Sequence, residues 1–217
     1  MKTKREMQNM ICKSLGSHLD PVFKQLGFTR EMNSVEYIRK LVDGEQRVCI
    51  FSEHKPNYEP LAWARLYPQI RLSFPAVNRI ASDLVGGQTA LIGGGDWTFS
   101  QPIDLVIPKQ HHKCWFIYDE HSVESCMQSL LQSLQTWILS FLNEYTSIES
   151  LTIAYANKDP RFVWSRALCM FVTAALIHGG QLKKAAEVLE TKFGRPGVRL
   201  QYGMAFDYVT NLESSGK

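Results

Sequence analysis

Apolar residues near the start of the chain recur every three or four positions, from Met7 to Leu26. This spacing places them along one stripe of an amphipathic helix. Asp20-Pro21 interrupts the stripe, because proline lacks a backbone donor, and Gly27 follows its last apolar position. We therefore expect a helix that kinks or restarts at Asp20 and ends at Gly27.

Two alternating segments follow, residues 34–41 and 46–52, and Asp43-Gly44 lies between them. Alternation of apolar and polar side chains predicts strands, and the tolerance of Asp-Gly for positive φ is typical of a tight hairpin turn. The pair is the clearest strand signal in the sequence. Because polar residues occupy one face of the first strand, we expect this sheet to be partly exposed to solvent.

The chain from 53 to 68 holds three prolines among aromatic residues, which predicts a loop or an edge excursion. Short apolar runs then predict strands at 69–74, 89–92, 103–107 and 114–118. Pro75 opens a short helix between the first two of them. These segments predict a meander-like, mainly antiparallel sheet.

Helical periodicity dominates the remainder. Ser122 is the expected N-cap of a long helix with apolar positions from Val123 to Tyr145. Asp159-Pro160 is expected to cap a second helix over 161–177, and a third covers 182–193. The stretch 198–212 is ambiguous between helix and strand. The sequence thus predicts an α+β fold with an N-terminal helix on a mainly antiparallel sheet, followed by a C-terminal helical layer.

At 217 residues, the chain is long enough for one compact domain with an extension. We expect a helix-plus-sheet portion at 1–120 and a helical portion at 121–217 packed on it. Hydrophobic residues make up 45% and charged residues 21% of the sequence, which excludes a disordered or fibrous chain.

The net charge of +3 falls short of what a dedicated nucleic-acid binder carries, so no nucleic-acid partner is expected. No lysine or arginine lies between Lys113 and Lys158, whereas five acidic residues do. The five cysteines form no CxxC pair, which favours reduced, buried thiols. The N-terminus lacks the apolar core of a secretory signal, and the longest apolar run, 167–177, is too short to cross a bilayer. We expect a cytoplasmic protein without a membrane partner.

Residues with metal-ligating chemistry cluster at His111, His112, Cys114 and His121. Adjacent side chains in an extended segment point in opposite directions, so at most two of them converge, and we expect no metal and no cofactor. The sequence contains no phosphate-binding loop and no nucleophile motif. A metal-dependent hydrolase or nucleotide-acting enzyme built on His111, His112 and Asp119 remains the alternative function.

The strongest functional signal is the aromatic segment before residue 68. Tyr, Trp and Arg are the residue types that anchor protein interfaces, since each buries a large area and keeps a polar handle. We predict a non-enzymatic protein-binding function, in which nearby acidic groups steer a basic partner. The expected partner-binding residues are Tyr58, Trp63, Arg65, Tyr67, Asp119, Glu120 and Glu124. The competing interpretation is that the rings fold back over the sheet as a lid.

The string LDPVFKQLGFTREMNSVEYIRK, from Leu19, resembles the opening of the DUF4304-like bacterial domains. Members of that family have an N-terminal helix that ends in a Leu-Gly-Phe turn, here Leu26-Gly27-Phe28, and then an aromatic hairpin, here with Tyr37. The resemblance covers about the first half of the chain. It implies an immunity protein of the kind used in toxin–antitoxin pairs and contact-dependent inhibition between bacteria, with a toxin domain as the protein partner. It implies no catalytic residues.

Overall fold

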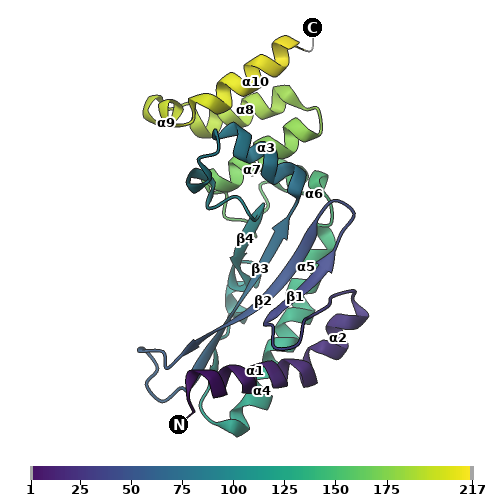
Figure 1. Ribbon diagram of the computed structural model, residues 1–217, viewed down its shortest axis with the longest axis vertical. Coiled ribbons are helices and arrows are strands. Elements are labelled where there is room, and N and C mark those ends of the chain that lie inside the picture. Colours follow the sequence, from purple (N-terminus) through teal and green to yellow (C-terminus); the bar gives the residue numbers. More distant parts are fainter. Residues whose placement is uncertain (1, 216–217) are drawn as a thin grey trace. The chain divides into compact units, whose positions relative to one another are not determined.

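The computed structural model describes residues 2–215 and confirms the α+β fold, with an N-terminal helix, a five-stranded antiparallel sheet and C-terminal helices (Figure 1). The described residues form two compact units that interleave along the sequence. The first contains the chain up to Leu41, Glu45–Arg71 and Ser100–Glu144. The second contains Val42–Gly44, Leu72–Phe99 and the chain from Tyr145 onward.

The predicted N-terminal helix restarts at Asp20, as expected. Helix α1 spans Lys4–His18 and α2 spans Asp20–Gln25, with Pro21 in the first turn of α2. A capping box between Thr3 and Glu6 satisfies the first backbone N–H groups of α1. The apolar stripe of α1 is buried in the first unit.

The sheet contains β1 Glu36–Lys40, β2 Glu45–His54, β3 Ala64–Ser73, β4 Phe99–Pro102 and β5 Trp115–Ile117. Its order is β1-β2-β3-β4, and β5 also pairs with β3. The predicted hairpin is confirmed, since β1 and β2 are antiparallel and flank Asp43-Gly44. Because β2 occupies one edge of β3, the short strands β4 and β5 share the other edge.

The expectation of a loop or an edge excursion over 53–68 holds for only part of that segment. Strand β2 continues to His54 and β3 begins at Ala64, which leaves only residues 55–63 as the connection. The prolines suggested a loop, but the alternation of buried Ala64, Leu66 and Ile70 with more exposed residues determines the structure. Pro68 is tolerated inside β3 although it cannot donate a backbone hydrogen bond.

Two predicted strands are also wrong. Residues 89–92 and 103–107 form 3₁₀ turns, η1 Thr89–Ile92 and η2 Ile103–Leu105, and a third turn, η3, covers Lys109–His111. Apolar runs this short do not distinguish a strand from a helical turn. The strand in this region is β4, and β5 lies where 114–118 predicted it.

The predicted long helix is one continuous helical segment of three parts, α4 Glu120–Ser133, the π-helical η4 Leu134–Ile138 and α5 Leu139–Glu144. Its N-cap is Asp119, whereas Ser122 is the third helical residue and completes the capping box. Helix α4 packs against α1 and β5 in the first unit. The compact units therefore do not divide at residue 120, because α4 is part of the core beneath the sheet.

The second unit is mainly helical. It contains α3 Pro75–Leu84, α6 Ile148–Ala156, α7 Arg166–His178, α8 Leu182–Phe193, α9 Pro196–Gln201 and α10 Gly203–Ser215. Helix α7 is almost wholly buried, and α3, α6 and α8 pack on it. The helix predicted from Asp159-Pro160 instead begins after Ser165, whose side chain accepts from the Leu168 N–H. The ambiguous stretch 198–212 is helical. Among residues 2–215, no helix has both the length and the apolar character needed to cross a membrane.

Candidate binding face and edge cavity

The predicted binding residues Tyr58, Arg65 and Tyr67 lie together on the face of the sheet opposite the buried side of β3. The side chains of β3 alternate strictly here, with Ala64 and Leu66 fully buried and Tyr67 39% exposed. Arg65 is paired in register with Phe116 of β5. We call this surface the aromatic–arginine face, and it comprises Phe51, Tyr58, Arg65, Tyr67, Arg71, Phe116 and Tyr118.

Ring and guanidinium contacts hold the face together. Phe51 of β2 stacks on Tyr67 of β3 with ring centres 5.7 Å apart, and the Arg71 guanidinium lies 5.1 Å from the centre of the Phe51 ring. Phe116 contacts both Tyr58 and Tyr118 edge-on or tilted, at 6.3 and 6.1 Å. Tyr58 is 56% and Tyr118 41% exposed, so the rings are ordered by one another and still open to solvent. Phe51, Tyr67 and Phe116 lie in strands, whereas Tyr58 folds from the connection of β2 and β3 onto Phe116.

Trp63, the fourth predicted anchor, is half-buried and lies immediately before β3. Its backbone N–H donates to the Ile117 carbonyl at 2.7 Å, and its carbonyl accepts from the Lys55 N–H at 3.0 Å. Both bonds tie the connection of β2 and β3 to the sheet.

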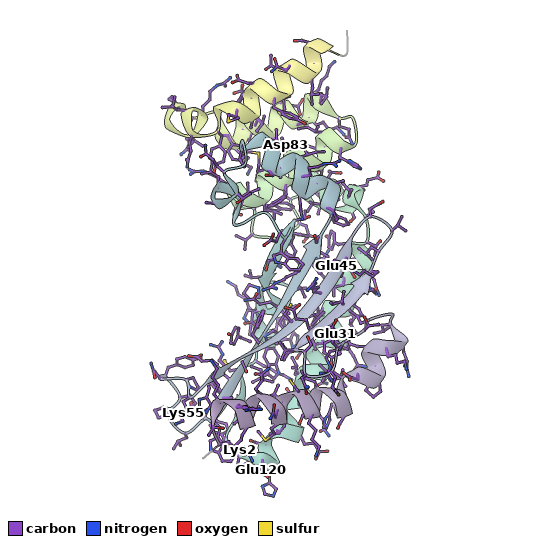
Figure 2. The ribbon with its side chains drawn as sticks, in the orientation of Figure 1. Lys2, Glu31, Glu45, Lys55, Asp83 and Glu120 are labelled. Atoms are coloured by element: carbon purple, nitrogen blue, oxygen red, sulfur yellow. The ribbon has the colours of Figure 1, made fainter. Side chains whose placement is uncertain are left out.

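The acidic residues after β5 serve local structure. Asp119 caps α4, and hydrogen bonds from the Ser122 backbone lower the pKa of its carboxyl group. Glu120 forms a 2.8 Å ion pair with Lys2, which lowers its pKa, and the two side chains meet at one end of the first unit (Figure 2). Glu124 accepts a hydrogen bond from Gln128. Only Tyr118 directly connects this segment to the aromatic–arginine face.

A small cavity of about 150 Å³ lies at the edge of β3, where its neighbouring strand changes from β5 to β4. Residues from the middle of β3 form one wall, and the ends of β4, η2 and β5 form the rest. Its lining residues are Arg65, Leu66, Tyr67, Pro68, Gln69, Pro102, Asp104, Lys113 and Trp115. We call it the edge cavity.

Three polar atoms in the walls of the edge cavity are shielded from solvent and have no hydrogen-bond partner among the described residues. They are Arg65 Nε, Asp104 Oδ1 and Trp115 Nε1. Trp115 is only 4% exposed. Proteins pair almost all buried polar groups, so three such atoms around one cavity make it a candidate binding site. Sequence reasoning missed Asp104, Lys113 and Trp115, since nothing in the local pattern shows that these residues converge.

The alternative metal site is not assembled. In the described part of the chain, no three His, Cys, Asp or Glu side chains lie close enough together to hold a metal ion. His111 packs against Trp137 with ring centres 5.3 Å apart, and His112 Nε2 lies 2.8 Å from the Ile107 carbonyl oxygen. The Asp119 side chain accepts a hydrogen bond from the Ser122 backbone N–H as the N-cap of α4.

The expectation of buried cysteines holds for four of the five. Cys114, which precedes β5, is exposed, whereas Cys12, Cys49, Cys126 and Cys169 are buried. Burial raises the pKa of Cys49 and of Cys126 to about 12. Cys114 is therefore the one accessible thiol among the cysteines.

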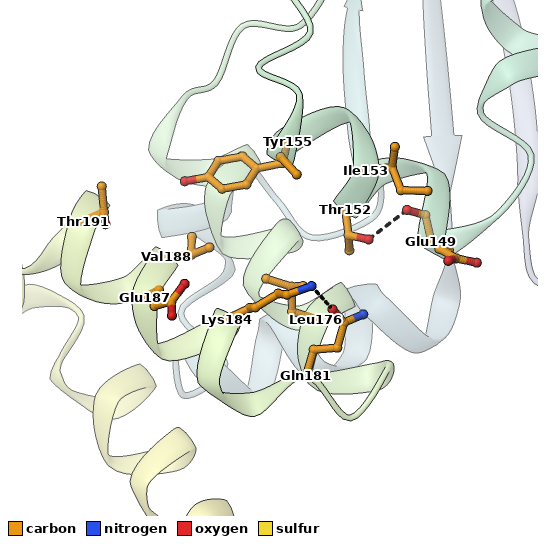
Figure 3. A pocket seen from close by; sticks show the side chains of 11 residues that line it. Glu149, Thr152, Ile153, Tyr155, Leu176, Gln181, Lys184, Glu187, Val188 and Thr191 are labelled. Atoms are coloured by element: carbon orange, nitrogen blue, oxygen red, sulfur yellow. Dashed lines mark hydrogen bonds between the residues drawn. The ribbon is translucent and has the colours of Figure 1, made fainter.

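The second unit has a larger groove of about 390 Å³ between α6 and α8 (Figure 3). Two hydrogen bonds join residues within the groove. Lys184 donates to Gln181 at 2.8 Å, and Thr152 donates to the Glu149 carbonyl at 2.8 Å. These polar groups already have partners, whereas three polar atoms of the edge cavity have none among the described residues. The edge cavity is therefore the stronger candidate for a ligand site.

No family model, curated protein or solved structure matches this chain.

Proposed function

We propose that this chain is a non-enzymatic, cytoplasmic protein that binds one protein partner on the aromatic–arginine face. The observation that carries the proposal is a contiguous set of partly exposed rings on the sheet surface, with Arg65 and the ion-paired Arg71 beside them. Tyrosine and arginine are over-represented among residues that dominate binding energy, because they bury apolar area and still satisfy polar groups. Contiguous exposed rings of this kind mark interaction sites.

The order already present in the face supports tight binding. Association costs free energy when rotamer-rich side chains must be immobilised. The Phe51–Tyr67 stack and the Arg65–Tyr58 hydrogen bond fix these side chains before a partner arrives. A partner therefore meets a preformed surface.

On the resemblance to DUF4304-like domains, we propose that the partner is a toxin domain and that the chain acts as its immunity protein. In this proposal Arg65 pairs with acidic groups of the toxin while the rings bury its apolar surface. The carboxylates of Asp119 and Glu120 are engaged within the chain, so they contribute to association rate more than to the bound complex.

The test is a direct binding measurement with the purified protein encoded immediately upstream of this chain's reading frame. Tyr67→Ala and Trp63→Ala should each weaken the complex, the first by about 2 kcal/mol, or roughly 30-fold in Kd. Trp63 is half-buried and is not part of the aromatic–arginine face, so its replacement should weaken binding less than Tyr67→Ala does. Tyr208→Ala, on α10 of the second unit, is the matched control and should leave Kd unchanged.

A cellular measurement separates binding from immunity. Cells that produce the upstream protein should survive when they also produce the wild-type chain and should lose that protection with Tyr67→Ala. Equal Kd values for wild type and Tyr67→Ala would reject the face as the interface. Binding without protection would retain the interface and reject the immunity role.

A further inference from the structure

The edge cavity has a chemical character that the protein-binding face does not explain. Two hydrogen-bond donors, Arg65 Nε–H and Trp115 Nε1–H, and one acceptor, Asp104 Oδ1, lie shielded in its walls without partners among residues 2–215. Leaving such groups unpaired costs stability, more so for charged groups. A ligand that pairs all three recovers that cost.

We propose that the edge cavity binds a small carboxylate that carries a hydroxyl or ammonium group on the carbon next to the carboxyl. Its carboxylate oxygens would accept from Arg65 and Trp115, and its hydroxyl or ammonium group would donate to Asp104. Charge-assisted hydrogen bonds of this kind are the strong ones. The proposal does not require the protein partner, although Arg65 belongs to both sites.

The size of the cavity suits a small ligand. Its volume is about 150 Å³. Glycolate and glycine, with five heavy atoms each, are small enough to enter it. Leu66, Pro68 and Pro102 supply the apolar part of its lining.

The local charge favours an anion. Arg65 and Lys113 contribute two positive charges to the lining and Asp104 contributes one negative charge. Lys113 is exposed, and its Nζ donates to Ser129 at 3.4 Å, so it acts at the mouth of the cavity. An α-hydroxy acid, with one negative charge, neutralises the site more completely than a zwitterionic amino acid does.

The fold explains why the site exists at this position. The edge of β3 pairs with β5 through Ala64–Leu66 and with β4 farther along the strand. Pro68 lies between these partners and has no N–H to offer a third strand. The chain between β4 and β5 leaves the sheet here, and η2 brings Asp104 to the gap.

The experiment compares sodium glycolate, glycine and sodium acetate, with sodium chloride as the ionic control, using the full chain. At a concentration of about ten times its Kd, glycolate should raise the melting temperature of the protein by about 3 °C. Acetate has the carboxylate but lacks the hydroxyl that would donate to Asp104, so it should bind about tenfold more weakly. Acetate binding as tightly as glycolate, or no shift with any of the three acids, would overturn the proposal.

Trp115→Phe removes the indole N–H and keeps an aromatic ring in the core. Glycolate affinity should fall about tenfold, while the melting temperature without ligand should stay the same or rise, because an unpaired buried donor is gone. Asp104→Ala should lose the preference for glycolate over acetate. Trp137→Phe is the matched control, because Trp137 lies in η4 and does not line the cavity. It should change neither the glycolate affinity nor the melting temperature.

Cys114 provides a second readout, since it directly precedes Trp115 and is the exposed thiol. Glycolate should slow its alkylation in the wild-type protein and not in Trp115→Phe. Equal glycolate affinity in wild type and Trp115→Phe would show that the ligand binds elsewhere and would end the proposal. None of these measurements uses the protein partner, so failure here leaves the proposed function standing.

Discussion

Arg65 Nη1 donates a 2.8 Å hydrogen bond to the hydroxyl of Tyr58, and the same hydroxyl donates to Glu53 at 2.7 Å. The guanidinium also lies 5.6 Å from the centre of the Tyr58 ring. The hydrogen bond raises the pKa of Arg65 above its usual value. A residue in the connection of β2 and β3 thus fixes the direction of a β3 side chain, so the face and the edge cavity share one oriented arginine.

Tyr58→Phe should loosen this arrangement without unfolding the chain. The variant keeps the ring and removes the hydroxyl that links Arg65 to Glu53, so Arg65 must be immobilised when the partner binds. We expect about a threefold rise in the Kd for the partner, carried by the dissociation rate, and a change in unfolding free energy below about 0.5 kcal/mol. Surface plasmon resonance and urea unfolding check the two values. Tyr208→Phe is the control, and a Tyr58→Phe variant with wild-type kinetics would contradict the preordering argument.

Gln46 is the buried polar residue on which the first unit should depend most. Its side chain is fully buried, accepts from Arg39 Nε at 2.8 Å and donates from Nε2 to the Leu142 carbonyl at 2.6 Å. It therefore joins β1, β2 and α5. Gln46→Leu should cost about 3 kcal/mol of unfolding free energy, because it leaves a buried carbonyl and an arginine without this partner. Urea unfolding measures the loss. Gln132→Leu, on the exposed face of α4, should cost almost nothing, and equal stabilities of the two variants would show that Arg39 and Leu142 find other partners.

Local patterns predicted the elements whose signals are strong over several residues. The helix restart at Asp20, the hairpin at Asp43-Gly44 and the helix over 182–193 each follow from periodicity and a turn residue acting together. The errors occur where one signal overrode another. Proline suggested a loop where Pro68 lies inside β3, and Asp159-Pro160 suggested a helix start where Asp159 binds Arg161.

The candidate site was only partly predictable, for a topological reason. Tyr58, Arg65 and Tyr67 are close in sequence, so residue type alone pointed to them. The edge cavity joins Arg65 to Asp104 and Trp115, and their meeting depends on which strands share an edge of β3. Likewise, a Cβ on Gly44 would lie 2.0 Å from the Ser73 carbonyl oxygen, a close approach that no turn propensity reveals.

Chemical modification should distinguish Cys114 from the other cysteines. A small maleimide at neutral pH should add to one thiol in the native chain, because the others are buried and burial raises the pKa of Cys49 and Cys126 to about 12. Reactivity requires the thiolate. Intact-protein mass spectrometry should show one adduct in the native state and five after denaturation. Cys114→Ser is the control and should take up none, and a second rapid adduct would mean that a buried thiol is transiently opened.

The second unit should lose stability in acid through Asp159. Its carboxylate accepts from Arg161 Nη2 at 2.7 Å and from the Tyr145 hydroxyl, and these bonds lower its pKa to about 2 although partial burial opposes the charge. A pKa below the unfolded value of about 4 stabilises the fold above pH 4, and this contribution disappears as the pH falls towards 2. With the side chain 12% exposed, the shift corresponds to about 2 kcal/mol. Asp159→Asn should therefore be less stable than wild type at pH 6 and nearly equal at pH 2, as measured by urea unfolding across that range. Asp207→Asn, at an exposed position of α10, is the control and should have the same pH dependence of stability as wild type. If Asp159→Asn remains equally destabilised at pH 2, packing and not charge would account for the stabilisation by Asp159.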